Sequence, residues 1–569
     1  MAKDPVSEMA PGAAEVVGGD IPERHQWFGH PRGLSTLFFT EMWERFSYYG
    51  MRALLVLYMT AEAVGGNPGL AYGEGRAGAV YGLYTGFVYL LALPGGWIAD
   101  NLWGQRRAVF VGGCIIAAGH FSMAAPLLGL PEQTFFFFGL FLIVLGTGLL
   151  KPNVSTMVGE LYPEGGARRD AGFSIFYMGI NVGVILGPTI CSFLGEGYSF
   201  HWGFSVAGFG MVLGLIQYKL GDHYLETAGL PPQDDPQEVM SRRSRNFYLA
   251  LAGAAALLVG GIGLITSGAV AVTLEQVALA FGHSIILLTI LFFAYLIFNW
   301  KYSAGFLAVF AAALAFLLQG RGLSFDVAAQ WSSGVTLGLF LLVMLGYLAV
   351  KREEVGLQRR RLMVIFWLFL LAAAFWSGFE QAGSSLNLFA RDLTDREVLG
   401  WTMPAGWLQN INPLFIVLLA PVFGSTWVWL SRRNANPSIP MKFGLGLVGP
   451  SAGFFVLAWG AANATAEQPV TMAWLIVTYF LHTCGELCLS PVGLSSMTKL
   501  APPKRVGQMM GVWFIAAALG NLFAGLVAGQ LEELAPSALF WSVAWFVGGV
   551  GLVALLLSPF VKKLMGDIE

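Results

Sequence analysis

The stretch that decides the fold runs from Glu41 to Arg52 and reads Glu-Met-Trp-Glu-Arg-Phe-Ser-Tyr-Tyr-Gly-Met-Arg. It lies inside an apolar segment, about Leu34 to Thr60, which is long enough to cross a bilayer, because a crossing helix needs about 20 residues. Four side chains spaced i, i+4, i+7 and i+11 form one stripe on such a helix: Glu41, Arg45, Tyr48 and Arg52. A charge inside a spanning helix costs about 2.5–3.5 kcal/mol, so the stripe, with Glu44 beside it, must face other protein or a water-filled cavity. A salt-bridge ladder between helices would meet the same requirement.

The composition indicates a helical protein with many membrane-spanning segments. Of its 569 residues, 56% are hydrophobic and 12% charged, whereas a soluble domain carries about 25% charged residues. The apolar runs are continuous and longer than the ~10-residue alternating segments of a membrane barrel. The net charge of −2 implies no attraction to nucleic acid. The four cysteines lack metal or redox spacing and are expected to be reduced packing residues.

The order of the apolar segments predicts an all-α membrane protein made of two six-helix bundles with extra helices inserted between them. The predicted regions are a cytoplasmic tail (1–33), an N-terminal bundle (34–220), linkers with inserted helices (221–361), a C-terminal bundle (362–561) and a second cytoplasmic tail (562–569). Basic residues gather in alternate loops, which places that side and both termini in the cytoplasm. The linkers on both sides of the insert are basic, so the insert must cross the membrane an even number of times. It has four apolar segments, of which the third is short, so two or four crossings fit. Because it has no charged stripe, we expect it to form peripheral, lipid-facing hairpins.

Lys151 lies in the fourth apolar segment, after a glycine-containing run. A lysine at that depth needs an acidic partner, and the first helix offers Glu41 and Glu44, although the side chain could instead extend to the interface. The phosphate-binding pattern Gly-x-x-x-x-Gly-Lys-Ser/Thr is absent, which disfavours an ATP-driven pump. His-Glu-x-x-His and Gly-x-Ser-x-Gly are absent too, so we expect no catalytic residues and no enzymatic activity.

The second half carries two isolated acids in apolar helices, Glu380 and Glu486. Each is a candidate functional residue, because an ionisable side chain inside the membrane is costly. Pro491 follows Glu486 and should bend or soften that helix. In the first half, Asn181 supplies a donor and an acceptor without charge, although a lone membrane asparagine is often only a helix–helix contact.

Taken together, these motifs resemble the proton-dependent oligopeptide transporter family of the major facilitator superfamily. The resemblance is carried, in order, by Glu-x-x-Glu-Arg-Phe-x-Tyr-Tyr from Glu41, the loop Gly96–Arg107, Phe-Tyr-x-x-Ile-Asn-x-Gly from Phe176, Phe375–Gln381, Asn412-Pro413, Gly485–Gly493 and Met510–Phe514. It implies the major-facilitator fold, with a substrate site near the midplane between the halves. It also implies di- and tripeptides as substrates and protons as the coupling ion, with no other cofactor and no metal.

The resemblance also assigns roles to individual residues. The peptide carboxylate would be bound by Arg45, Arg52 and Lys151. The amino end would be bound by Asn181, Asn412 and Glu486, with Asn410 as a less favoured substitute for Asn412. The pocket would be lined by Tyr48, Tyr49, Tyr89, Ser490 and Trp513, the last of which could equally be a packing residue. Proton coupling would involve Glu41, Glu44, Lys151 and Glu380.

The charges themselves suggest a reason for proton coupling. Two acids and three bases give the first half's membrane segments a net charge of +1, and two acids give the second half −2. Such a cavity suits a ligand with a carboxylate at one end and an amine at the other. One bound proton would make the site neutral and lower the cost of reorientation.

The sequence therefore predicts a proton-coupled symporter that imports di- and tripeptides by alternating access. We expect it in the lipid bilayer of a bacterial inner membrane and functional as a monomer. The alternative is the same fold carrying another small substrate, such as nitrate, an amino acid or a peptide-like drug.

Overall fold

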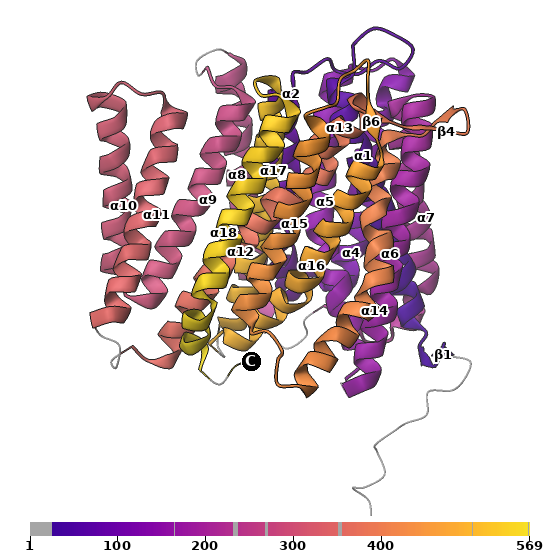
Figure 1. The fold of residues 1–569 in the computed structure, drawn as a ribbon. Helices are drawn as coiled ribbons and strands as arrows, with labels where there is room; N and C mark the ends of the chain where they lie inside the picture. Colours follow the sequence, from indigo (N-terminus) through magenta and orange to yellow (C-terminus); the bar gives the residue numbers. More distant parts are fainter. Residues whose placement is uncertain are drawn as a thin grey trace, which may run out of the picture.

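The computed structural model describes residues 26–163, 166–231, 237–267, 271–350, 355–502, 505–566 and 568. Residues 1–25, 567 and 569 of the predicted tails lie outside these ranges, as do 232–236 and 351–354 of the predicted linkers. Long helices run side by side through most of the described part (Figure 1), and 14 of those it contains are long and apolar enough to cross a membrane. Helices are expected there because hydrocarbon offers no partner for backbone N–H and C=O groups.

The N-terminal half consists of six long helical segments, some of which continue into a short 3-10 or π-helical turn. In chain order they are α1 (Gly33–Thr60), α2 (Glu74–Leu90) with α3 (Ala92–Ile98) and η2 (Ala99–Trp103), α4 (Gln105–Ala124) with η3 (Ala125–Leu128), α5 (Glu132–Glu160), α6 (Gly166–Gly197), and α7 (Phe200–Gly221) with η4 (Asp222–Leu225).

The insert contributes four helices: α8 (Gln237–Thr266), α9 (Leu274–Ile297), α10 (Trp300–Ala315) with η5 (Phe316–Gly320), and α11 (Phe325–Val350). The predicted short third segment corresponds to α10, which with η5 reaches 21 residues and is long enough to span. α9 packs on α2, α12 and α17, whereas α10 and α11 form an outer hairpin (Figure 1). Leu342 on α11 is 67% exposed, as suits a lipid-facing surface.

The C-terminal half again consists of six long segments. They are α12 (Leu357–Phe379) with η6 (Glu380–Gly383) and α13 (Ser385–Asp392), η7 (Ala405–Asn410) with α14 (Ile411–Arg432), α15 (Ile439–Ala461), α16 (Ala473–Leu500), α17 (Val506–Ala528) with η9 (Gly529–Glu532), and α18 (Pro536–Met565). The strands are two residues long and lie in loops: β1 (Gln26–Trp27) pairs with β2 (His30–Pro31), β3 (Thr394–Asp395) with β6 (Val470–Thr471), and β4 (Glu397–Val398) with β5 (Trp401–Thr402).

Helix α1 lies inside the N-terminal half. It is not one of the 14 apolar helices, because it carries four charged residues, yet most of its side chains are buried. It packs along α6 and α7. Gly183 of α6 permits the close approach, since a Cβ there would collide with the carbonyl oxygen of Met42 on α1. The charged stripe is therefore enclosed by protein.

The two halves meet along α2 and α17. Gly78 of α2 and Gly525 of α17 face each other so closely that a Cβ on either would collide with the carbonyl oxygen of the other. Only glycine allows two helix backbones to approach in this way. This glycine pair fixes how tightly the halves can close.

Further contacts join the halves at the end of the bundle opposite the C-terminus, which lies at the bottom of Figure 1. Asn387 donates to the carbonyl oxygen of Ala53 at 2.8 Å, and Arg391 donates to the Thr60 hydroxyl at 2.7 Å. The Glu196 carboxylate accepts the backbone N–H groups of Ala405 and Gly406 at 2.7 and 3.0 Å. The space between the halves is therefore closed at this end.

Candidate functional site

A cavity of about 140 Å³ lies between the two halves. α1, α2 and α6 of the N-terminal half form one side of its wall, and α12, η6, η7, α14 and α16 of the C-terminal half form the other. Seven residues singled out from the sequence line it: Tyr49, Arg52, Tyr89, Asn181, Glu380, Asn412 and Glu486. The structure thus brings together residues that are far apart in the chain, at the interface where an alternating-access carrier binds substrate.

One wall of the cavity holds an ion pair that crosses between the halves. Nη2 of Arg52 on α1 lies 2.8 Å from Oε2 of Glu380 on η6. Both side chains are buried, and Glu380 is 3% exposed. Removing one partner of such a pair would leave an uncompensated charge in a low-dielectric site, which typically costs about 3–5 kcal/mol. The pair therefore joins the two halves across one wall of the cavity.

The opposite side of the cavity holds a carboxylate without a cation. Asn412 donates to Oε2 of Glu486 at 3.1 Å and to the Thr483 hydroxyl at 2.9 Å. Among the residues that the structure describes, no lysine, arginine or histidine lies within ion-pair distance of Glu486. Asn181 lines the same cavity and donates to the backbone oxygen of Tyr177 at 2.9 Å. This end of the cavity can accept a positively charged group.

Behind the cavity, two glutamates of α1 share one arginine. Nε of Arg45 lies 2.8 Å from Glu41 and 2.9 Å from Glu44. Oε2 of Glu41 and Oε1 of Glu44 are buried, and within the described residues neither has a hydrogen-bond partner. Two carboxylates on one guanidinium leave an excess negative charge, so this cluster is a place where a proton can be held.

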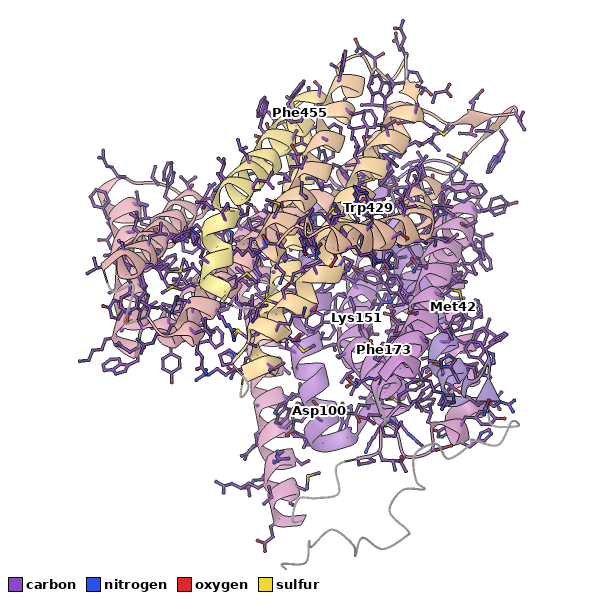
Figure 2. The ribbon with its side chains drawn as sticks, turned by 60° about the horizontal axis from the view of Figure 1, so that its bottom comes forward. Met42, Asp100, Lys151, Phe173, Trp429 and Phe455 are labelled. Atoms are coloured by element: carbon purple, nitrogen blue, oxygen red, sulfur yellow. The ribbon has the colours of Figure 1, made fainter. Side chains whose placement is uncertain are left out.

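The expected ion pair between Lys151 and an acid of α1 is not formed in this structure, because Arg45 already binds both glutamates. The Lys151 ammonium instead lies 3.8 Å from the centre of the Tyr89 ring, close enough to Glu44 for their charges to interact. No salt bridge of Lys151 is found in the described part of the chain. Figure 2 shows Lys151 toward the middle of the molecule, between the halves.

Several predicted contacts with the cavity need correction. Arg45 does not line it, because its guanidinium is held by Glu41 and Glu44, and Lys151 is separated from it by Tyr89. Three predicted lining residues also lie off the wall: Tyr48, Ser490 and Trp513. The Tyr48 ring stacks on Tyr84 within the N-terminal half.

The other two lie on helices of the C-terminal half. Ser490 is one turn beyond Glu486 on α16, past the end of the cavity. The Trp513 indole packs against Gly493 of α16, which leaves no room for a Cβ there. This contact matches the packing role that the sequence left open for Trp513.

Other lining residues were not predicted, among them Trp376, Gln409, Tyr479 and His482. Helical spacing could have identified two of them, since Trp376 precedes Glu380 by four residues and His482 precedes Glu486 by four. Gln409 stands in the same short run as Asn412. In the described ranges, no group of three His, Cys, Asp or Glu side chains is placed to bind a metal ion.

Comparison with known proteins identifies the family. The family described as "PTR2: POT family" matches residues 106–296 and 336–542, more than half of the chain. The chain belongs to the POT family. The predicted family and fold class are therefore confirmed, and the chain is a multi-pass membrane transporter rather than an enzyme.

Relatives of known name are similar over nearly the whole transporter. It is 38% identical to the peptide transporter YePEPT of Yersinia enterocolitica, over 97% of this chain and 98% of that protein. It is 35% identical to the di-/tripeptide transporter of Lactococcus lactis subsp. cremoris, over 95% of this chain and 98% of that protein.

Solved structures are similar over the same extent. A crystal structure of the peptide transporter POT in complex with sulfate has a TM-score of 0.75 and 35% identity, over 95% of this transporter and 97% of that chain. A crystal structure of a POT family transporter in complex with 5-aminolevulinic acid has a TM-score of 0.74 and 29% identity, over 95% of this transporter and 98% of that chain.

Proposed function

We propose that the transporter is a proton-coupled symporter that imports di- and tripeptides by alternating access. It would act in a bacterial inner membrane as a monomer, with both termini in the cytoplasm. One observation carries the proposal: the cavity has a cation, Arg52, on the N-terminal side and an unpaired carboxylate, Glu486, on the C-terminal side. The names of the relatives, peptide transporter and di-/tripeptide transporter, support the same substrate class.

A short peptide with free ends fits this arrangement. Its amine would meet Glu486, Asn412 and Asn181, which line the cavity and offer acceptor oxygens. Its carboxylate would meet Arg52, and Lys151 once the Tyr89 ring moves aside. The alternative of an anion such as nitrate is disfavoured, because Glu486 would repel it.

Protons would act at two places. One is the Glu41–Glu44–Arg45 cluster, which carries one carboxylate more than its arginine can neutralise. The other is Glu380, where protonation would weaken the bond to Arg52 and release the contact between the halves. A proton taken up from outside would thus favour the change of the loaded carrier from one open side to the other. Symport requires this link between proton binding and reorientation.

The first prediction concerns the amino end of the peptide. Wild-type protein is expected to prefer a free dipeptide over its N-acetylated form by about 1.5–3 kcal/mol, the range for a hydrogen bond to a charged group. Glu486→Gln keeps an oxygen for Asn412 but carries no charge, so it should bind both ligands about equally. Calorimetric titration of both ligands into both proteins measures the difference.

Glu62→Gln serves as the matched control, since Glu62 is an exposed acid outside the cavity. It should retain the wild-type preference. A wild-type protein indifferent to acetylation would argue against peptide binding at Glu486, as would improved binding of both ligands by Glu486→Gln.

A second prediction concerns the glycine contact between α2 and α17. Gly78→Val should lower peptide uptake into proteoliposomes about fivefold or more, because overpacking of about 1–3 kcal/mol would oppose closure of the halves. The three atoms nearest to a Cβ at this position are backbone atoms of Gly525 and Gly529, which cannot rotate away. Gly549→Val on α18, where a Cβ meets nothing within 4 Å, should transport normally. Equal uptake by the two variants would contradict the gating role of this contact.

A further inference from the structure

A second polar cavity, of about 430 Å³, lies outside the substrate site. It is formed where the loop between α14 and α15 meets the end of α16 and the end of α18, at the same end of the molecule as the C-terminus (Figure 1). Three lysines from three different helices line it: Lys442 on α15, Lys499 on α16 and Lys562 on α18. We call this the lysine pocket.

The lysine pocket concentrates positive charge. No aspartate or glutamate is among its lining residues. None of the three lysines makes a salt bridge within the described ranges, and the Lys442 ammonium rests 4.8 Å from the centre of the Trp427 ring. Like charges that share one cavity repel each other, so an anion bound between them would be favoured.

The lining also includes serine and asparagine side chains, which can donate hydrogen bonds to such an anion. Ser438 at the start of α15 makes no side-chain capping bond, so its hydroxyl does not occupy the helix's first N–H groups. α15 has 23 residues, and its N-terminus carries a partial positive charge that opens onto the pocket. Asn434 and Ser495 add further polar side chains. The N-terminus of α15 and the three lysines therefore both favour an anionic ligand.

We propose that the lysine pocket binds a phosphate group. Its lysines approach from three helices, which suits a phosphate with several oxygens better than a planar carboxylate, and lysine is a common phosphate ligand. The pocket also lies where three candidate membrane-spanning helices begin or end, the level at which lipid headgroups lie. The source of the phosphate is either an anionic lipid headgroup or a soluble phosphate.

A phosphate in this pocket would connect α15, α16 and α18. Pro491 on α16 lines the pocket and follows Glu486 of the substrate cavity by five residues. Binding would therefore act on the end of the helix that carries Glu486. This inference does not depend on which substrate the transporter carries.

The test compares wild type with the triple variant Lys442→Gln, Lys499→Gln, Lys562→Gln. A matched triple, Arg432→Gln, Arg433→Gln, Lys563→Gln, removes the same charge from the same end but from residues that do not line the pocket. Binding of phosphatidylglycerol and phosphatidylcholine to purified protein is measured by native mass spectrometry. Protection against thermal unfolding by inorganic phosphate is compared with chloride at equal, low ionic strength, because salt screens exposed lysines.

Wild type and the matched triple should bind the anionic ligand at least about tenfold more tightly than the lysine triple, as expected when charge-assisted contacts are lost. A preference for phosphatidylglycerol alone identifies a lipid headgroup, and protection by inorganic phosphate identifies a soluble source. The proposal is overturned if the matched triple loses as much affinity, if the lysine triple binds like wild type, or if neither phosphate source is preferred over its control.

Folding of the variants is checked separately. Lys499 and Lys562 are exposed, so the single variants Lys499→Gln and Lys562→Gln should unfold at the wild-type temperature in the absence of phosphate. Each should already bind the anionic ligand several-fold more weakly. Unchanged binding by both would overturn the proposal even if the triple variant did not fold.

Discussion

Replacing Lys151 with alanine is expected to abolish peptide uptake driven by a proton gradient. In the structure, Glu41 and Glu44 share Arg45, and Lys151 is the next cation whose charge reaches them. Without it, Arg45 is the only cation beside the two carboxylates among the described residues, and an excess negative charge stays buried. The cluster would then bind a proton permanently and no longer respond to the gradient. Uptake of a labelled dipeptide into proteoliposomes should fall to that of empty liposomes.

The matched control is Lys301→Ala, which removes an exposed lysine from α10 of the insert and should leave uptake unchanged. Lys151→Arg keeps the charge and should retain part of the activity. Gradient-driven uptake by Lys151→Ala at the wild-type rate would remove Lys151 from the proton-coupling group.

Glu380→Gln is expected to abolish accumulation of peptide against its gradient while peptide exchange across the membrane persists. Glutamine keeps the size of the side chain but cannot carry a charge, so its bond to Arg52 no longer changes with protonation. Accumulation against a concentration gradient should be lost, because a side chain that cannot bind and release a proton at this position cannot couple the proton gradient to the peptide. Peptide exchange with equal concentrations on both sides needs no net proton movement and should persist.

Counterflow and gradient-driven uptake, measured on the same proteoliposomes, distinguish these outcomes. Glu467→Gln in an exposed loop is the control and should behave as wild type in both assays. If Glu380→Gln lost both activities equally, Glu380 would be a structural residue; if it kept both, protonation of Glu380 would not be part of coupling.

The fold could be predicted from the sequence because long apolar runs and alternating basic loops are local signals. The cavity could be predicted in part for the same reason: Arg52, Glu380 and Glu486 stand out as charges in apolar helices wherever those helices lie. Which charges meet could not be predicted. Arg45 forms ion pairs with two glutamates of its own helix, so the Lys151 ammonium lies over the Tyr89 ring instead. Which of these contacts forms depends on how α1, α2 and α5 are oriented relative to one another.

The residues that close the cavity were even harder to predict from the sequence. Glu196 gives no sign in the sequence that its carboxylate caps the start of η7, because the contact joins two segments that are distant in the chain. Tyr48 and Trp513 are aromatic residues in apolar helices, and only the rotation of each helix decides whether such a side chain faces the cavity or packs within one half.

The buried charges of α1 also bear on how the protein is made. α1 leaves the ribosome before the helices that follow it in the chain, and its four charges oppose its entry into lipid. Lys151 arrives with α5, and Glu380 follows α12. At about 5–20 residues per second, the interval between α1 and Glu380 is on the order of tens of seconds. We therefore expect the insertion machinery to shield α1 until these later helices have been made.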